Sequence, residues 1–548
     1  MSCNGADQPA RVKARARPLR NERRVLCVIA LIGAARVLLL SAAFPLFNNV
    51  DEYSHFDAVY KYSRGELPHP DRLYHDTRSS TLITWFGSRE YVVRPSSHPG
   101  AVYPPPPWSV SPEAARVRLR AGVRHLRGQK NHELAQPPVY YALAGTWYRL
   151  GEALGLACGH LVFSIRWLNA LFMVGLVWAA HRLACATGRR DPLTRIGVPL
   201  LVAVLPQDAF YSISNDALSP LLTALALVAI LRMQMGPPRS SLSLLAGLLA
   251  ALAILTKYTN CVILIPALAL TGMNLWKSEF HPRRWLRCNA LFWLAALAPI
   301  IAWGVRNAAL FGDPTARRLI FEALGWRAKP LGALLDHPLF SFPGLLHFLD
   351  GLCRDFWRGR FMWNGEFMAH SWADAVYVAT SGFFLAAATV AVARELVRWG
   401  RNRRRGPSAE SSVDVAAWLT LAGGVALLAF FSIWIETGER SVPPRDDPFF
   451  TMGRLISGCI VPFALLYVRG LRSLTTWIPE SARAAVRAGL FGLVVAAIVI
   501  SEVWLSEPPA RSEYNWFRLE SVEYGPCAAT PPVGMGSARP SSSAPIPE

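Results

Sequence analysis

The hydrophobic positions of the chain gather in blocks of about 15 to 23 residues, separated mostly by short polar segments. A helix of about 20 apolar residues crosses the hydrocarbon core of a bilayer. The pattern therefore predicts an all-α polytopic membrane protein with about eleven transmembrane helices. Their approximate ranges are 25–47, 161–181, 195–213, 217–231, 242–256, 259–276, 285–305, 373–393, 413–435, 453–468 and 484–503.

Longer polar segments set the expected domain organisation. A basic N-terminal segment covers 1–24, a transmembrane domain covers 25–503, and a tail rich in Pro and Ser covers 504–548. Two long loops, 48–160 and 306–372, interrupt the transmembrane domain. The composition of the tail is typical of a partly disordered segment.

Basic side chains cluster between the apolar blocks and give a formal net charge of +20. Loops rich in Lys and Arg stay in the cytoplasm. The rule predicts a cytoplasmic N-terminus, a C-terminus outside and both long loops outside, in a bacterial inner (plasma) membrane. The clustering argues against a nucleic-acid partner. With 52% hydrophobic and only 17% charged residues, the chain is no ordinary cytosolic enzyme.

One apolar block, Val139 to Cys158, carries Arg149 and Glu152 near its middle. If this block crossed the membrane, every later loop would change sides and several basic loops would lie outside. Charges in the middle of a spanning helix are also costly. We therefore expect an amphipathic helix at the membrane interface, with spanning as the alternative.

Three features have two interpretations each. Cys353 and Cys527 both fall outside, where they either pair or remain free thiols. Arg36 lies within the first span and is either functional or paired with a carboxylate for packing. The Arg- and Trp-rich segment 354–363 either clamps a sugar or, as we favour, rests on the membrane as an aromatic belt.

The first candidate for chemistry follows directly after the first apolar block. On a helical turn, Asp51 and Glu52 both come within one turn of His55, so the three side chains can share a face. A carboxylate beside apolar matter can have a raised pKa and act as a base. The alternative is a charged cluster that only ends the helix, and spacing alone favours that alternative.

Further candidates lie at the same predicted membrane face. Gln136 and Tyr140 flank two prolines at a helix entry, where an aromatic anchor explains the pattern as well. Asp216 lies in a tight turn and also suits a helix N-cap. Lys257 and Arg454 fall at span ends, where snorkelling explains a lone cation as well as ligand binding does. Their agreement in side favours a site for a lipid phosphate with a reacting sugar beside it.

These motifs resemble the GT-C superfamily of membrane glycosyltransferases. The resemblance rests on Asp51-Glu52-x-x-His55-Phe56 after the first span, followed by Gln136-Pro137-Pro138-x-Tyr140-Tyr141. It also includes Arg166 at the start of the next span, Asn215-Asp216 and Thr256-Lys257. The chain looks most similar to a bacterial branch related to the protein mannosyltransferases and lipid A aminoarabinose transferases. The resemblance covers most of residues 25 to 470.

The resemblance implies a GT-C-like fold and a donor in which a sugar is linked to polyprenyl phosphate. It implies Asp51 as the catalytic base, with Glu52 and His55 beside it, and inversion at the anomeric carbon. Lys257, Arg454 and Arg166 are then candidates to hold the leaving phosphate. Asp216, Gln136 and Tyr140 complete the expected substrate-binding set. The resemblance fixes no cofactor, and a divalent metal, Mg²⁺ or Mn²⁺, stays open because a single Asp216 replaces a fuller acidic motif.

The acceptor is left open as a lipid, a glycan or a protein. Two other functions compete with the transferase. A lipid or polysaccharide transporter or flippase would carry buried charges along a path, whereas the charged motifs here collect at one face. A polymerase or ligase of lipid-linked glycans is closer in chemistry and differs in its donor.

Overall fold

The computed structural model describes residues 20–521 apart from 50, 89, 92, 188–190, 275–281, 402–407 and 438–442. The described chain is mostly helical, with only four two-residue strands among its described residues. Most of the predicted N-terminal segment and most of the predicted tail lie outside the described residues.

Eight of the described helices are long and apolar enough to cross a membrane. They comprise α1 (Arg20–Ala43), α6 (Cys158–Ala186), α8 (Ser219–Met235) with the turn Asn215–Ala217 directly before it, α11 (Pro282–Phe311), α14 (Ser371–Arg401), α15 (Ala409–Trp434), α16 (Ile460–Leu474) with the turn Gly453–Cys459 directly before it, and α17 (Glu480–Ala510). Three apolar helices are shorter, namely α7 (Pro192–Val204), α9 (Ser240–Ile254) and α10 (Leu264–Asn274). A helix therefore occupies each predicted span. Because three of them are short, the count of eleven crossings stays a prediction.

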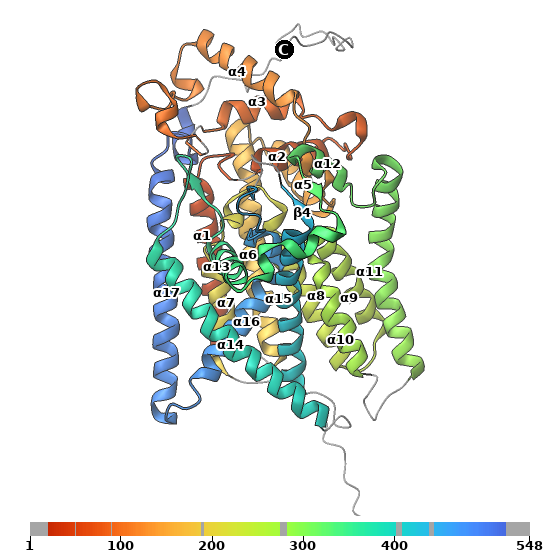
Figure 1. The fold of residues 1–548 in the computed structure, drawn as a ribbon. Coiled ribbons are helices and arrows are strands. Elements are labelled where there is room, and N and C mark those ends of the chain that lie inside the picture. The colour runs from red at the N-terminus through yellow and green to blue at the C-terminus, as the bar shows by residue number, and fades with distance from the viewer. Residues whose placement is uncertain are drawn as a thin grey trace, which may run out of the picture.

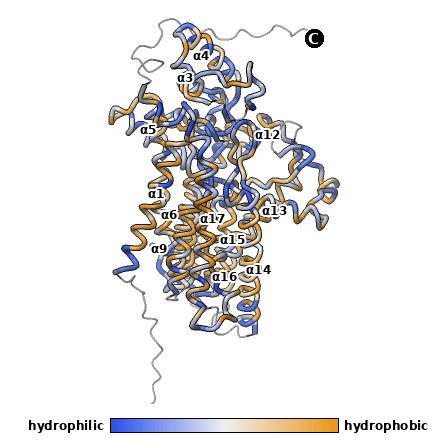
Figure 2. The backbone as a smooth tube through the Cα atoms, turned by 90° about the vertical axis from the view of Figure 1, so that its left-hand side faces the viewer, coloured by the Kyte–Doolittle hydropathy of each residue, from blue (hydrophilic) through white to orange (hydrophobic). Residues whose placement is uncertain are grey.

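The long helices stand side by side as a bundle, and the first long loop covers one end of it (Figure 1). We call this cover the cap. It consists of α2 (Glu52–Ser63), α3 (Thr77–Phe86), α4 (Pro112–Arg127) and α5 (Val139–Ala153) of the first long loop, together with α12 (Arg317–Leu324) of the second. The bundle is predominantly hydrophobic along its length, whereas hydrophilic residues gather in the cap (Figure 2). This distribution is the one expected of a bundle in lipid with a cap in water.

Small residues let the helices of the bundle approach closely. A Cβ atom on Gly470 of α16 would lie 1.8 Å from the Phe384 carbonyl oxygen of α14. A Cβ atom on Gly247 of α9 would lie 2.3 Å from the Phe292 carbonyl oxygen of α11. Such close backbone approach gives van der Waals contact where lipid offers no hydrophobic driving force.

The ambiguous block 139–158 forms α5, which lies in the cap and packs beside α2 rather than crossing the bundle (Figure 1). Its Glu152 pairs with Arg64 of α2. Cys158 already begins α6, so the block is two elements rather than one. This arrangement agrees with the expected interfacial helix.

The charges within the bundle are paired. Arg36 of α1 donates to both carboxylate oxygens of Glu502 in α17, each at 2.5 Å, and to the hydroxyl of Tyr211 at 2.7 Å. Arg36 also donates to the carbonyls of Ala203 and Leu205 at the end of α7. The packing interpretation of Arg36 therefore holds in this structure, because the guanidinium ties three helices together.

The second long loop contributes α13 (Phe342–Arg358) and the strands β1 (Arg327–Ala328), β2 (Met362–Trp363) and β3 (Glu366–Phe367). β2 and β3 form a hairpin whose turn, Asn364-Gly365, has positive φ at both residues, as a type I′ turn requires. The backbone N–H groups of this turn donate to the carbonyls of Glu90 and Tyr91 at 2.6 and 3.1 Å. The hairpin thereby joins the two long loops.

β1 pairs antiparallel with β4 (Ile435–Glu436), which follows α15. Cys353 of α13 is a free thiol, so its suggested pairing with Cys527 is wrong. Cys527 itself lies outside the described residues. Cys158 is the described cysteine that is disulfide-bonded.

Candidate active site

Asp51 lies at the turn between α1 and α2, where its backbone adopts the left-handed conformation with φ of 63°. It occupies the N-cap position of α2, yet its carboxylate makes no capping hydrogen bond. The carboxylate instead accepts a hydrogen bond of 2.8 Å from Nη2 of Arg454. A strained, non-Gly backbone that releases a side chain from its capping role is the kind of outlier found at functional sites.

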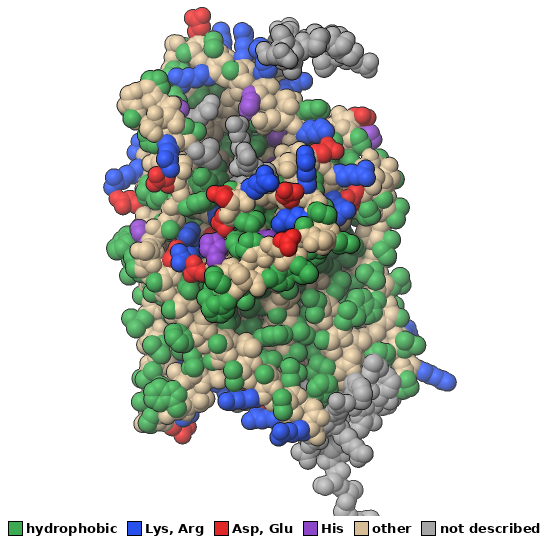
Figure 3. All heavy atoms as spheres, viewed as in Figure 1, with side chains coloured by type: hydrophobic (Ala, Val, Ile, Leu, Met, Phe, Trp, Pro, Cys, Tyr) green, Lys and Arg blue, Asp and Glu red, His purple; other side chains and the backbone are tan. Residues whose placement is uncertain are grey.

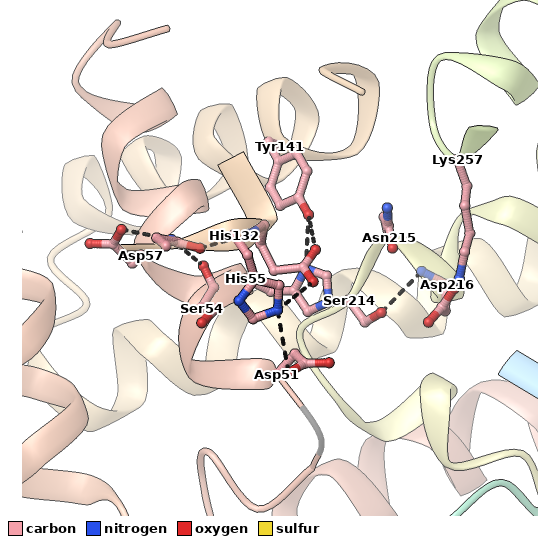
Figure 4. A network of polar contacts seen from close by, with 12 residues as sticks. Asp51, Ser54, His55, Asp57, His132, Tyr141, Ser214, Asn215, Asp216 and Lys257 are labelled. Carbon is pink, nitrogen blue, oxygen red and sulfur yellow. Dashed lines mark hydrogen bonds and ion pairs between the residues drawn. The ribbon is translucent and has the colours of Figure 1, made fainter. Parts of the chain in front are cut away.

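A histidine that sequence reasoning passed over lies on the other side of Asp51 (Figure 4). Nε2 of His132 is 3.5 Å from Oδ1 of Asp51 and 3.3 Å from Oε1 of Glu133. Burial lowers the pKa of His132, but hydrogen bonds to Asp51 and Glu133 outweigh burial and raise that pKa to about 10. His132 is therefore an imidazolium at neutral pH, held between two carboxylates.

The same contacts keep the Asp51 carboxylate ionised. Burial raises its pKa, while the hydrogen bond from His132 and the charge of Arg454 outweigh burial and hold the pKa well below the usual range. The expected raised pKa is therefore wrong for Asp51. Its side chain is 25% exposed, so it stays accessible to a ligand.

His55 contacts the cluster through Tyr141 and Glu133. Its Nδ1 is 2.8 Å from the Tyr141 hydroxyl and 3.3 Å from Oε2 of Glu133. Burial lowers the pKa of His55, which opposes the effect of the nearby Glu133 carboxylate. His55 is buried and its ring orients Glu133. A shared helix face predicts that the His55 side chain lies beside that of Asp51, and the structure shows no hydrogen bond or ion pair between these two side chains.

Asn131 fixes the position of this cluster relative to α2. Its side-chain amide donates to the carbonyl of Ser54 at 2.9 Å and to Asp57 at 2.8 Å, and its Oδ1 accepts from the backbone N–H of Glu133 at 2.9 Å. The turn His132–Ala135 is thus pinned to α2 by one residue.

Glu52 points away from Asp51 and into the bundle. It is fully buried and accepts from Nε and Nη2 of Arg166 at 2.7 and 2.6 Å, and from the backbone N–H of Ile213 at 2.8 Å. The remaining N–H groups of Arg166 donate to the carbonyls of Ser41, Phe44 and Pro45. All five guanidinium N–H groups are therefore used.

Two expected roles need correction on this geometry. Arg166 is 1% exposed and has no donor left for a phosphate, so it is not a substrate contact. Glu52 is bound to Arg166 and is not a catalytic carboxylate. Together they form a buried clamp that holds the turn between α1 and α2 against α6.

Asp216 and Lys257 form a second buried pair. The Lys257 ammonium donates to Oδ1 of Asp216 and, at 3.2 Å, to the carbonyl of Arg454. Burial lowers the pKa of Lys257, and the Asp216 charge opposes this. The backbone N–H of Asp216 donates to Ser214 Oγ at 3.1 Å. Arg454 therefore links the Asp51 cluster to this pair.

Gln136 and Tyr140 differ in burial. Gln136 is half-buried, and its backbone N–H donates to the carbonyl of Glu133 at 3.0 Å. Tyr140 is fully buried, so a direct substrate contact from Tyr140 is wrong for this conformation. Tyr141, its neighbour, carries the polar contacts to His55 and Glu133.

Asp208 is a further carboxylate that the sequence did not single out. It is buried, its Oδ2 accepts from the backbone N–H of Arg360 at 3.2 Å, and its Oδ1 has no hydrogen-bond partner in the described chain. Burial raises the pKa of Asp208 to about 6, and the charge of Arg454 opposes this. The sequence pattern places Asp208 inside the predicted span 195–213. In the structure α7 already ends at Val204, so Asp208 lies beyond the helix and near the site.

The residues that sequence reasoning missed, His132 and Glu133, lie just ahead of Gln136 and the two prolines. Their signal was a His and a Glu directly ahead of a helix entry, which an ordinary helix start explains equally well. Asp51, His132 and Glu133 offer donor atoms that all lie within 4.8 Å of one another. Two carboxylates and an imidazole at this spacing could hold a divalent metal ion.

Comparison with known proteins gives a family but no characterised relative. No curated protein matches the chain. Among solved structures, the chain is similar to the oligosaccharyltransferase of Archaeoglobus fulgidus in complex with Zn and sulfate, at 12% identity, over 89% of this chain and 53% of that one, with a TM-score of 0.41. The same enzyme tethered to an acceptor peptide matches at 13% identity, over 89% and 55%, with a TM-score of 0.40.

The chain thus spans about half the length of the solved structures it matches. Similarity at this level carries no information about the chemistry of the site. The family model described as "Predicted membrane protein (DUF2142)" matches residues 36–406, well over half of the chain. The chain therefore belongs to the DUF2142 family of predicted membrane proteins.

Proposed function

We propose that this chain is an inverting glycosyltransferase that moves a sugar from a polyprenyl-phosphate donor to an acceptor hydroxyl at the outer face of the membrane. The observation that carries the proposal is the meeting of Asp51, Arg454, Lys257 and Asp216 at the cap end of the bundle. A partly exposed carboxylate beside two cations at a lipid–water boundary suits the attack of a hydroxyl on a lipid-linked sugar.

In the proposed reaction, the acceptor oxygen forms a bond to the anomeric carbon and transfers its proton to Asp51. The bond between that carbon and the phosphate oxygen breaks, and its electron pair leaves with polyprenyl phosphate from the opposite face. Arg454 and Lys257 then stabilise the charge that develops on the phosphate. Arg454 joins the proposed base to the proposed phosphate site, because its guanidinium contacts Asp51.

The neighbouring residues position these groups. His132 holds the Asp51 carboxylate from the side opposite Arg454, and Glu133 and Tyr141 hold His132 and His55 in turn. A carboxylate kept ionised by two cations is a weak base. It therefore accepts the proton late, when the attacking oxygen has become acidic.

Asp51, His132 and Glu133 also fit a divalent metal ion such as Mn²⁺ or Mg²⁺. The fit rests on the donor set, two carboxylates and an imidazole whose donor atoms all lie within 4.8 Å of one another. When bound, the ion would supply charge stabilisation for the donor phosphate. Asp51, His132 and Glu133 would hold it.

Two features support placement of the cap outside. The disulfide of Cys158 is typical of an oxidising compartment. The basic ends of the helices opposite the cap suit the cytoplasmic side. We therefore propose a multi-pass protein of a bacterial inner membrane, with a lipid, a glycan or a protein as acceptor.

The test measures lipid-linked sugars and surface glycans by mass spectrometry in a deletion strain. The strain is complemented with the natural chain, with Asp51→Asn, or with Asp71→Asn at equal abundance. Asp71 is a matched control because its carboxylate is 87% exposed in the same loop. We expect a polyprenyl-phosphate sugar to accumulate, and a glycan to lose one residue, in the deletion and Asp51→Asn strains only.

If lipid pools and glycans are the same in all strains, the proposed donor and the proposed base both fail, and a transporter becomes the better explanation. Metal binding has its own test, in which Mn²⁺ affinity of the purified chain is measured by equilibrium dialysis. Glu133→Gln should weaken Mn²⁺ binding, whereas Asp71→Asn should not. Equal affinity in both variants would remove the metal from the proposal.

A further inference from the structure

An open cavity of about 520 Å³ lies beside α12, lined by Arg318, Phe321, Glu322, Gly325, Trp326 and Arg327. Gly325 ends α12 in the left-handed conformation, with φ of 66°, and turns the chain so that Trp326 and Arg327 face back along the cavity wall. α12 and β1 thus build the cavity from one short stretch of the second long loop. Charged side chains of both signs gather on this face of the cap (Figure 3).

The cavity adjoins the candidate active site. α12 packs against the turn His132–Ala135, which carries two members of the Asp51 cluster. On its other side, the ring of Trp326 packs edge to face on Phe450, with a centroid distance of 5.3 Å. Phe450 and Met452 belong to the segment that leads directly to Arg454. The cavity therefore lies between the turn His132–Ala135 and the segment that leads to Arg454.

The charges of the lining favour an anion. The side chains of Arg318 and Arg327 make no hydrogen bond or ion pair with any described residue, whereas Glu322 pairs with Lys130 at 3.2 Å. Glu436 stands opposite Arg327 in the β1–β4 register, but its carboxylate lies 3.9 Å from Arg445. Two arginines with unused donors offer the fork geometry that recognises carboxylate and phosphate.

The aromatic part of the lining favours a sugar ring. Phe321 and Trp326 contact each other at a centroid distance of 6.1 Å and are fixed by Trp434 and Phe450 behind them. Rigid aromatic side chains supply a large contact area at low entropic cost. A polar ligand with a flat apolar face fits such a wall.

We propose that this cavity is the acceptor subsite and that it binds a saccharide carrying an oxyanion, either a carboxylate or a phosphate. The inference rests on the proposed glycosyl transfer, because the subsite places the acceptor beside Asp51. Arg318 and Arg327 bind the oxyanion, and Trp326 and Phe321 contact the ring that bears it.

The experiment measures binding of three probes to the full chain in nanodiscs: trigalacturonate, a phosphorylated maltotriose and neutral maltotriose. We expect one or both anionic probes to bind at least about tenfold more tightly than the neutral probe. The double variant Arg318→Ala/Arg327→Ala should abolish that preference. Arg120→Ala, an exposed arginine of α4 without a recorded partner, should retain it.

The two anionic probes distinguish a carboxylate from a phosphate acceptor. Equal affinity for all three probes, or an unchanged preference in the double variant, would overturn the subsite. Binding requires no turnover, so Asp51→Asn should bind the anionic probe normally. If the mass-spectrometric test showed no transfer, the measured binding of the anionic probes would still hold. If the anionic probes did not bind, the mass-spectrometric test of transfer would be unaffected.

A second, independent feature is an apolar surface on the segment 331–349, below the cap. This segment lies outside the helices that are long enough to cross a membrane. Its large side chains are nonetheless exposed, with Leu331 at 84%, Leu335 at 76%, Phe340 at 56%, Phe342 at 73% and Leu346 at 50%. We call this surface the shelf. An apolar patch of this size marks a contact with a partner or with lipid.

The opposite face of α13 is already used for packing. Phe348, Leu352 and Phe356 are buried against the bundle, so the helix has one apolar face inward and another outward. Polar pairs sit on the remaining side, where His347 lies 3.0 Å from Asp447 and Arg354 pairs with Asp350. Hydrophobic side chains lie directly beneath a band of charged ones across the middle of the molecule (Figure 3).

We infer that the shelf inserts into the leaflet at the cap end of the bundle. Its hydrophobic underside continues into the lipid-facing surface of the bundle, and its charged side faces the cap, as an interfacial helix requires. The end of α13 bears on the candidate site, because Asp355 pairs with Arg360 at 2.5 Å and Arg360 donates its backbone N–H to Asp208. Membrane insertion thus fixes one wall of the site.

The test places a spin label at Leu346→Cys or, as the matched control, at the neighbouring His347→Cys in the full chain in nanodiscs. Power saturation then compares collisions with oxygen, which enriches in lipid, and with a water-soluble nickel chelate. We expect lipid exposure at 346 and water exposure at 347. Water exposure at both positions, or protection of 346 from both reagents as in a contact with a second copy, would overturn the inference.

Discussion

Asp51 and Glu52 are neighbours with opposite roles, and this contrast gives a sharp prediction. Glu52→Gln keeps the shape of the side chain but leaves the buried Arg166 guanidinium without a counter-charge. Removal of one partner from a buried pair costs about 3–5 kcal/mol. Asp51→Asn breaks a pair whose carboxylate is 25% exposed, so water can solvate part of the charge left on Arg454 and the cost is smaller than for the fully buried pair. Glu52→Gln should therefore unfold far more readily, although Asp51→Asn should be the inactive variant.

The assay is thermal unfolding of the detergent-solubilised chain, followed by a dye that fluoresces on reaction with thiols. Cys288 and Cys459 are buried free thiols that react only when the bundle opens. All variants are heated at one scan rate, because unfolding of such proteins is a kinetic quantity. The control is the double variant Glu52→Gln/Arg166→Met, which removes the unpaired charge and should recover part of the stability.

Two results would refute the reasoning. If Glu52→Gln unfolds like the natural chain, the clamp between Glu52 and Arg166 contributes nothing to the fold. If Asp51→Asn is as unstable as Glu52→Gln, its loss of activity would reflect misfolding, and the assignment of Asp51 to catalysis would have no support.

Two further predictions use the same assay. Gly470→Ala should destabilise the bundle by about 1–3 kcal/mol, because its Cβ would meet the Phe384 carbonyl, whereas Gly489→Ala in α17 has open space and should gain up to about 1 kcal/mol in helix propensity; equal behaviour of the two variants would contradict the close packing. Asp208 has a pKa raised by burial from 3.8 to about 6, so its contribution to stability is present below pH 3.8 and is lost as the pH rises through about 6. Asp208→Asn should therefore unfold at a higher temperature than the natural chain at pH 7, and the gap should narrow at pH 4.5; a gap independent of pH would contradict the raised pKa.

The sequence alone was sufficient to place the helices of the bundle. A long apolar block forms a helix of the bundle wherever it lies in the chain, because water excludes its side chains and lipid requires its backbone to be helical. Each predicted span accordingly holds an apolar helix. The same logic placed Asp51 just beyond the first span, where it lies in the structure.

Local pattern could not assign partners to the charged residues. Glu52 and Asp51 are adjacent, yet one faces Arg166, 114 positions away, and the other faces Arg454, 403 positions away. A helical turn makes both carboxylates equally able to join His55. Only the left-handed turn at Asp51 sends them in different directions.

His132 shows the same limit in another way. In sequence it is one histidine ahead of a helix entry, and nothing local distinguishes it from a solvated side chain. In the structure, its contacts with the carboxylates of Asp51 and Glu133 outweigh burial and make it a cation at the centre of the candidate site. Composition and periodicity determine which segments enter the membrane, because those depend on each segment's own transfer free energy. The tertiary structure decides which charges meet, because electrostatic pairing depends on distances that only packing sets.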